Sequence, residues 1–193
     1  MPHLIIIAGS NGSGKSTSAP SLLKDSLEVA DFVNADVIAQ GLCAFQPENA
    51  AIQAGRIMLD RIHALANKNI DFAFETTLAS RTFSSWIYKL KEKGYQFHLI
   101  FLWLKNPELS ILRVKERVKS GGHFVPEETI RRRYTSGLKN FFKLYRPLTD
   151  SWQLYDNSNA NQLSLIAYEA KGDRLIIQDN KIWSFLVETY DEK

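Results

Sequence analysis

Residues Gly9–Ser16 read Gly-Ser-Asn-Gly-Ser-Gly-Lys-Ser and complete the pattern G-x-x-x-x-G-K-[ST]. The apolar run Leu4–Ala8 stands directly before them and predicts a buried parallel strand, and residues 15–25 predict a helix. This strand, loop and helix arrangement is the setting in which the pattern forms a phosphate-binding loop. The chain is therefore expected to fold with this unit at its centre and to bind a nucleoside triphosphate there.

The residue types of the loop account for this chemistry. Glycines let the backbone curl so that successive N–H groups converge on phosphate oxygens, Lys15 reaches the same phosphates, and the Ser16 hydroxyl is placed to ligate Mg²⁺. We expect nucleotide contacts from nine consecutive residues: Gly9, Ser10, Asn11, Gly12, Ser13, Gly14, Lys15, Ser16 and Thr17.

Beyond the loop the sequence alternates between strand and helix patterns. Strands are expected at 3–8, 31–35, 70–76, 96–104 and 151–156, and helices near 15–25, 47–67, 81–93, 107–119 and 126–145. This alternation predicts an α/β fold with a five-stranded parallel sheet, helices on both faces and the ligand at the carboxyl ends of the strands. The tail predicts a β-hairpin at 163–178 and a short helix at 181–190.

Composition places few further demands on the chain. With 193 residues, of which 45% are hydrophobic, we expect one domain over residues 1–193. Cys43 is the one cysteine, so an intrachain disulfide is excluded. No apolar run approaches the length of a membrane span, and the loop lies too close to Met1 for a signal peptide. A cytoplasmic location is the expectation.

Basic residues are concentrated between Arg113 and Pro147. Three glutamates in this segment face ten cations: Arg113, Lys115, Arg117, Lys119, Arg131, Arg132, Arg133, Lys139, Lys143 and Arg146. Such a segment suits nucleic acid, but beside a phosphate loop it also suits a lid that closes over a triphosphate, here placed at about 113–135. The neighbouring aromatics Phe141, Phe142 and Tyr145 have helical spacing that favours a core role, which argues against nucleic acid.

Carboxylates follow two of the predicted strands. The second strand ends in Asn34-Ala35-Asp36, where Asp36 would accept a proton from a substrate hydroxyl, hold Mg²⁺ through water, or simply cap the next helix. The third strand ends in Glu75-Thr76-Thr77, which suits a substrate or water–Mg²⁺ contact. The fourth strand is apolar through Leu104 and carries no acid at its end, which favours a kinase over a motor or switch.

Arginines of the lid segment are candidates for stabilising phosphoryl charge. Arg113 and Arg117 are four residues apart and share a helix face. In the next helix Ile130, Tyr134 and Leu138 mark the buried side, so Arg131 and Arg133 flank it and Arg132 faces solvent. The turn Ser120–His123 is flexible enough for a hinge, while His123 alone is weak evidence of a ligand.

These motifs together resemble the small stand-alone members of the zeta toxin family. The resemblance covers about residues 3–158 and rests on the phosphate loop, Asn34–Asp36, Phe74–Thr77, Arg117–Glu127, Arg131–Tyr134 and Tyr155–Ser158. It implies a kinase-type P-loop fold, ATP and Mg²⁺ as ligands, and phosphoryl transfer to a hydroxyl of a UDP-activated amino sugar. It also implies a small antitoxin partner.

Site roles follow from the same resemblance. It implies that Lys15 and Ser16 bind phosphate and Mg²⁺, Asp36 is the general base, and Glu75 and Thr77 contact the acceptor. Arg117 matches the first lid arginine, and the second is Arg131 or a neighbour. Two alternatives remain: a nucleotide or polynucleotide kinase, and a non-catalytic ATP-binding module that interacts with an antitoxin-like peptide.

Overall fold

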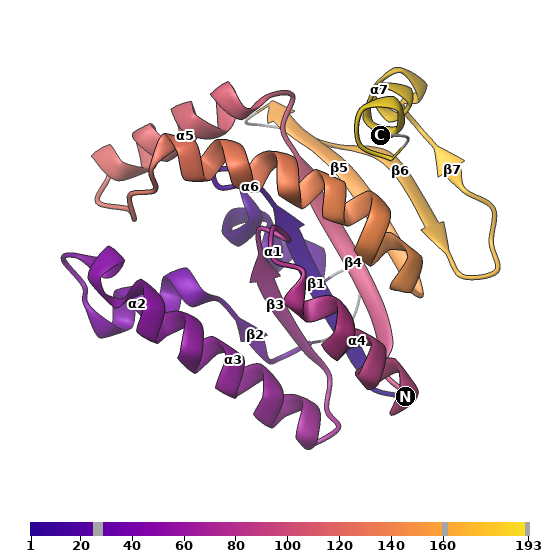
Figure 1. Ribbon diagram of the computed structural model, residues 1–193, viewed down its shortest axis with the longest axis horizontal. Helices are drawn as coiled ribbons and strands as arrows, with labels where there is room; N and C mark the ends of the chain where they lie inside the picture. The colour runs from indigo at the N-terminus through magenta and orange to yellow at the C-terminus, as the bar shows by residue number, and fades with distance from the viewer. Residues whose placement is uncertain (25–28, 160–161, 192–193) are drawn as a thin grey trace.

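The computed structural model describes residues 1–24, 29–159 and 162–191. A seven-stranded sheet in the order β2-β3-β1-β4-β5-β6-β7 forms its centre (Figure 1). The strands are β1 (His3–Gly9), β2 (Phe32–Val33), β3 (Phe72–Thr76), β4 (Gln96–Trp103), β5 (Ser151–Asn159), β6 (Gln162–Ala170) and β7 (Ile176–Ile177). Strands β1 to β5 are parallel, and β6 and β7 continue the sheet with antiparallel pairing.

Helices pack on both faces of this sheet. The α-helices are α1 (Lys15–Lys24), α2 (Ala35–Leu42), α3 (Ala51–Asn67), α4 (Thr82–Glu92), α5 (Pro107–Lys119), α6 (Glu127–Asn140) and α7 (Asn180–Tyr190). Shorter helical segments are the 3-10 helices η1 (Pro47–Ala50) and η3 (Arg146–Leu148) and the π-helical turn η2 (Phe141–Tyr145). Among the described residues, none of the helices has both the length and the apolar character that a transmembrane helix needs.

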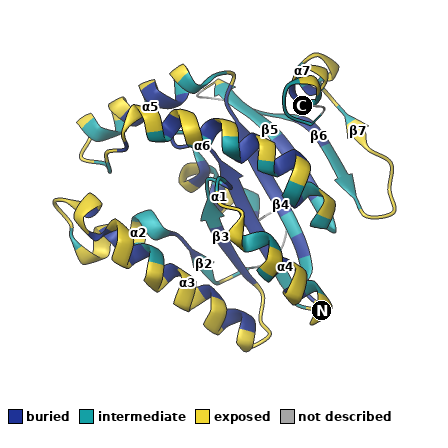
Figure 2. Ribbon diagram, viewed as in Figure 1, coloured by how far each residue is buried: buried dark blue, intermediate teal, exposed yellow. Residues whose placement is uncertain are grey.

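Strand β1 lies at the middle of the core because its successive side chains point to opposite faces. Leu4, Ile6 and Ala8 join the larger apolar cluster, which includes residues of α3, α4, α6, η2 and α7. Ile5 and Ile7 join a smaller cluster that includes residues of α1. Figure 2 shows β1 and β4 as the most deeply buried strands, between these helical layers.

The parallel five-stranded sheet, the C-terminal hairpin and the last helix that the sequence predicts are confirmed. The hairpin of β6 and β7 does not stand apart, because β6 pairs with β5 and extends the central sheet. The aromatic residues Phe141, Phe142 and Tyr145 are fully buried, as their helical spacing predicts. They contribute to the larger core and present no surface for a nucleic acid base.

The predicted second strand is wrong at its end. Strand β2 stops at Val33, and α2 begins two residues later where strand had been expected. Asn34 causes this change, since its side-chain oxygen accepts hydrogen bonds from the N–H groups of Asp36 (2.8 Å) and Val37 (3.3 Å). Asn34 is therefore the N-cap, and Asp36 lies in the first turn of α2 with its carboxylate free of any capping role.

The carboxyl ends of the parallel strands meet at one edge of the sheet. Ile7 pairs with Glu75, so the end of β3 lies directly beside the start of the phosphate loop. Helix α6 approaches this edge closely, because a Cβ atom at Gly137 would lie 2.5 Å from the carbonyl oxygen of Thr77. Loop, strand ends and lid helices thus converge on one region.

Candidate active site

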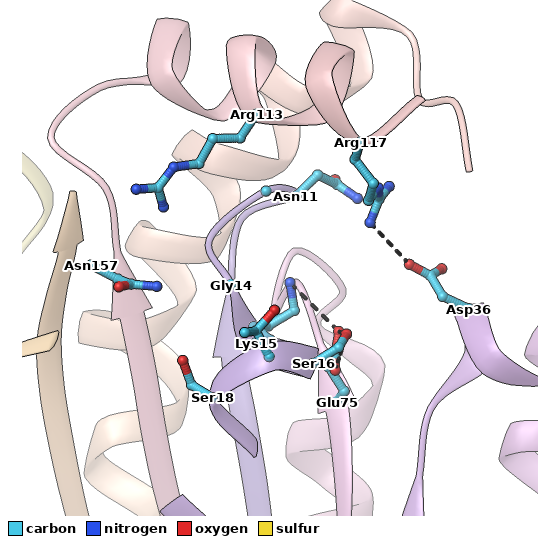
Figure 3. Close-up of a pocket in the computed structure, with 12 residues that line it drawn as sticks. Asn11, Gly14, Lys15, Ser16, Ser18, Asp36, Glu75, Arg113, Arg117 and Asn157 are labelled. Atoms are coloured by element: carbon cyan, nitrogen blue, oxygen red, sulfur yellow. Dashed lines mark hydrogen bonds and ion pairs between the residues drawn. The ribbon is translucent and has the colours of Figure 1, made fainter. Parts of the chain in front are cut away.

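The phosphate loop surrounds a cavity of about 400 Å³ at this edge, which we call the loop cavity (Figure 3). Its lining residues are Asn11, Gly12, Gly14, Lys15, Ser16, Thr17, Ser18, Asp36, Glu75, Arg113, Arg117 and Asn157. Of the predicted loop contacts, Gly9, Ser10 and Ser13 are not in this lining. Ser10 and Ser13 are buried, and the Ser13 N–H donates to the Ser10 carbonyl oxygen within the loop.

The loop backbone takes a conformation that glycine permits. Gly14 has a φ of +84°, and a Cβ atom there would lie 2.5 Å from the Asn157 amide nitrogen. Asn157, at the end of β5, donates a hydrogen bond from that nitrogen to the carbonyl oxygen of Ser13 (2.8 Å). The fifth strand thereby ties the loop in place, and only glycine leaves room for the contact.

Lys15 is held inside the loop, where its ammonium donates to the carbonyl oxygen of Ser10 (3.0 Å). Burial lowers the pKa of Lys15, and the nearby carboxylates Glu75 and Asp36 oppose that shift. Its Nζ lies 3.9 Å from Glu75 Oε1. The Lys15 ammonium therefore lies where it can bind the negative charge of a phosphate in the cavity.

Glu75 makes the densest set of contacts in the site. Its carboxylate accepts hydrogen bonds from the hydroxyl of Ser16 (2.9 and 3.1 Å) and from the amide of Asn34 (2.9 Å). Burial raises the pKa of Glu75, while Lys15 and the Ser16 hydrogen bond act in the opposite direction. The end of β4 carries no acid, whereas the end of β3, the strand beside β1, places the Glu75 carboxylate next to the phosphate loop.

The residues around Ser16 fit a magnesium ion. Mg²⁺ prefers oxygen ligands and binds through one or two protein groups together with phosphate oxygens and waters. The Ser16 hydroxyl and the Glu75 carboxylate provide such oxygens 2.9 Å apart, with Asp36 lining the same cavity. When bound, the metal would neutralise phosphate charge.

Arg117 connects the lid to Asp36. From the last turn of α5 its Nη1 lies 3.6 Å from Asp36 Oδ2, and its Nη2 donates to the carbonyl oxygen of His123 (2.9 Å). Arg113, one turn earlier, points to the opposite end of the loop cavity and donates to the carbonyl oxygen of Ser158 (3.0 Å). The shared helix face predicted for the two arginines therefore spans the cavity.

Of the two arginines expected to flank the buried side of α6, Arg133 lines the side cavity and Arg131 lines neither cavity. Arg131 pairs with Glu108 of α5 at 2.6 Å, and its side chain is 48% exposed. Arg133 instead points inward and donates to Asn11 Oδ1 of the loop (3.3 Å). Arg133 and Gly137 are four residues apart, so the face of α6 that packs closely on Thr77 also carries Arg133.

A second cavity of about 250 Å³, the side cavity, adjoins the first. Its lining residues are Asn11, Lys15, Asn34, Ala35, Asp36, Ala39, Ala51, Met58, Glu75, Thr76, Thr77, Phe83, His123 and Arg133. Asp36, Glu75 and Thr77, the predicted acceptor contacts, all belong to this lining. Asn11, Lys15, Asp36 and Glu75 line both cavities and mark their boundary.

The polar lining residues to which the sequence gives no site role include Asn34, Asn157 and His123. Asn34 and Asn157 fall within motifs that carry the family resemblance, and an asparagine before a short amphipathic stretch is a recognisable N-cap signal. Asn157 lies 144 residues from its loop partner Ser13. Nothing local in the sequence indicates that contact.

Fold and site together define a P-loop protein of the kinase type, with a basic lid over a phosphate loop. The family model of the zeta toxins matches residues 46–166. An uncharacterized protein of Haemophilus influenzae is 35% identical over 130 residues, which are 67% of this chain and 91% of that protein. The chain belongs to the zeta toxin family.

Solved structures show the same fold at low sequence identity. A chain in the crystal structure of the AvrRxo1-ORF1:-ORF2 complex has a TM-score of 0.76 and 16% identity, covering 96% of this chain and 63% of its own. A structure of that complex with ATP has a TM-score of 0.74. The PezAT toxin–antitoxin system of Streptococcus pneumoniae gives 0.66 at 17% identity, covering 100% of this chain and 80% of that one. This chain thus spans less than two thirds of its AvrRxo1 counterpart.

Proposed function

We propose that this protein is an ATP-dependent kinase that transfers the γ-phosphate to a hydroxyl group of a small acceptor molecule. The observation that carries the proposal is the meeting of two cavities at Lys15, Asp36 and Glu75. The loop cavity suits the triphosphate, because the phosphate loop lines it. A protein that only hydrolysed ATP would not need a second cavity of about 250 Å³ beyond the phosphate site.

The proposed transfer assigns one role to each group at the boundary. Asp36 takes the proton of the acceptor hydroxyl as its oxygen forms a bond to the γ-phosphorus. The bond between that phosphorus and the β–γ bridging oxygen breaks, and ADP leaves. Lys15, Arg117 and Arg133 provide positive charge to the transferring phosphoryl group. Ser16 and Glu75 would hold Mg²⁺ directly or through water.

Arg117 has two possible partners in this scheme. One partner is Asp36, whose Oδ2 lies 3.6 Å from Arg117 Nη1. A triphosphate in the loop cavity offers a stronger and closer anion, so we expect the guanidinium to turn toward it. Asp36 would then be available to the acceptor hydroxyl.

Family membership supports one acceptor class as the first to test. The resemblance to the zeta toxin family implies phosphorylation of a UDP-activated amino sugar. These sugars are therefore the first acceptors to test, followed by pooled cytoplasmic metabolites. A small antitoxin-like protein is the expected partner, because PezAT is a toxin–antitoxin system. Growth arrest on expression of the wild type, and normal growth with Asp36→Asn, would support a toxin role.

The decisive experiment incubates the protein with γ-labelled ATP and these acceptors and follows the label. The Asp36→Asn variant keeps the size of the side chain but removes the base, so transfer should fall by roughly 10² or more. ATP affinity should stay within about fivefold, since the loop is untouched. Asp60→Asn, an exposed change on α3, serves as the matched control.

Two outcomes would contradict the proposal. Transfer by Asp36→Asn at the wild-type rate would show that the base lies elsewhere, and Glu75 would be tested next. An ATP-dependent rise in the wild-type melting temperature without any labelled product would favour the non-catalytic nucleotide-binding module.

A further inference from the structure

The loop between α5 and α6 carries His123 to the side cavity. In Figure 1 this loop faces α2, the helix that carries Asp36. His123 is part of the lining of the side cavity and is absent from the lining of the loop cavity. His123 is therefore placed to contact the acceptor and not the nucleotide.

Arg117 and Gly122 hold this loop in place. A Cβ atom at Gly122 would lie 2.5 Å from Arg117 Cγ, so glycine allows the loop to fold tightly onto the arginine. The Arg117 guanidinium also donates to the His123 carbonyl oxygen at 2.9 Å. The arginine that lies beside Asp36 thus also fixes the backbone of His123.

The two ring nitrogens of His123 have different surroundings. Nδ1 is buried and has no hydrogen-bond partner among the residues that the structure describes. Glu48 of η1 places Oε2 4.0 Å from it, which is beyond hydrogen-bond distance. Because Nδ1 is enclosed and the ring lines the cavity, Nε2 is the nitrogen available to a molecule inside it. The ring itself is only 18% exposed.

A buried polar atom without a partner is unfavourable, and native structures rarely keep one without a reason. A small movement of the lid toward η1 would bring Nδ1 into hydrogen-bond range of the Glu48 carboxylate. That contact would hold the Nδ1–H tautomer and leave Nε2 as an acceptor directed into the cavity. The Glu48 side chain is 46% exposed, so little packing opposes this movement.

We propose that His123 is an acceptor-binding residue: Nε2 accepts a hydrogen bond from a second hydroxyl of the phosphoryl acceptor, and Glu48 orients the ring through Nδ1. This inference rests on the proposed kinase function. It assigns the acceptor to molecules with at least two hydroxyl groups, one at Asp36 and one at His123. Glu48 is a positioning residue, because it acts through the ring.

Two substitutions of His123 separate the roles of its nitrogens. Gln places a polar group near the position of Nε2, whereas Asn places one near Nδ1. The proposal predicts that His123→Asn raises the half-saturating acceptor concentration about tenfold, while His123→Gln stays within about threefold of wild type. The ATP affinity of both should be unchanged. His63→Asn, an exposed histidine on α3, is the matched control.

Glu48 is tested in the same assay, with γ-labelled ATP and a dilution series of the metabolite pool. Glu48→Ala should raise the half-saturating concentration about threefold, and Glu48→Gln, whose amide oxygen still accepts, should restore it. In the His123→Asn background Glu48→Ala should add no further loss, because the two residues act as one unit.

The outcomes distinguish this inference from the proposed function. If the wild type transfers no label, the kinase function fails and this inference fails with it. If the wild type transfers label and His123→Asn and His123→Gln both match it, only this inference is overturned. The reverse ranking, with Gln impaired and Asn normal, also overturns it, because the ring would then act through Nδ1 alone.

Discussion

The hydroxyl of Ser16 donates to the carboxylate of Glu75 at 2.9 Å, although 59 residues separate them in the sequence. The parallel register that sets Ile7 opposite Glu75 brings the two together. The Asn34 amide donates to both, at 3.2 Å to Ser16 and 2.9 Å to Glu75. The loop residue that suits Mg²⁺ and the carboxylate of β3 therefore form one connected unit.

Glu75→Gln should weaken the binding of Mg²⁺ to the nucleotide complex without unfolding the protein. Gln can still accept from Ser16 but lacks the negative charge that would orient Mg²⁺-bound water. We expect the Mg²⁺ concentration that half-restores the ATP-induced melting shift to rise about tenfold. Glu92→Gln, at an exposed position of α4, should behave like wild type. An unchanged magnesium titration for Glu75→Gln would contradict this role.

Lys15→Ala should abolish nucleotide binding and leave the fold intact. Lys15 lines the loop cavity and belongs to no apolar core cluster that the described residues form, so its removal should affect phosphate binding far more than folding. In wild type, ATP at a hundredfold excess over its Kd should stabilise the native state by about 2.7 kcal/mol. Differential scanning fluorimetry with an ATP titration should show this stabilisation as a rise in melting temperature, for wild type and for Lys89→Ala at an exposed position. A full shift in Lys15→Ala would refute the loop assignment.

Arg133→Ala should reduce kcat for phosphoryl transfer by about 10³, with a much smaller change in the KM for ATP, because the charge it meets develops in the transition state. Arg131→Ala should stay within about twofold of wild type, since Arg131 pairs with Glu108 at the surface and lines neither cavity. Steady-state kinetics of the two variants form a matched pair. If Arg133→Ala kept the wild-type kcat and Arg131→Ala lost it, α6 would have to rotate when the lid closes.

Stability should fall in mild acid because of a histidine far from the site. Burial and the neighbouring His3 lower the pKa of His98, and the two rings share a hydrogen bond of 3.0 Å. The folded state therefore binds a proton at His98 less readily than the unfolded state does. The contribution of His98 to the free energy of unfolding is full above about pH 6.5 and is lost as the pH falls below that value.

Urea unfolding between pH 7.5 and 5 measures this effect. His98→Asn should flatten the pH dependence, while His63→Asn on the surface of α3 should leave its slope intact. A wild-type slope in the His98→Asn variant would assign the acid sensitivity to other groups.

Local patterns in the sequence were enough for most of the fold. The apolar run before Gly9, the alternation of periodicities and the tail hairpin predict the parallel strands and their order along the chain, because each depends on near neighbours. The same holds for Phe141, Phe142 and Tyr145, whose helical spacing predicts their burial. The N-cap signal of Asn34 is also local, and it is the reason that β2 ends at Val33 and not at residue 35.

The identity of the site residues in the phosphate loop was likewise determined by the sequence, since the loop motif specifies its own chemistry. Which distant groups meet that loop was decided only by tertiary packing. Three consecutive arginines differ by about 100° around a helix, and the packed α6 directs Arg133 to the loop and leaves Arg131 at the surface. Asn157 and His123 reach the site through contacts between separate elements. Such contacts depend on strand register and helix rotation, which local spacing does not encode.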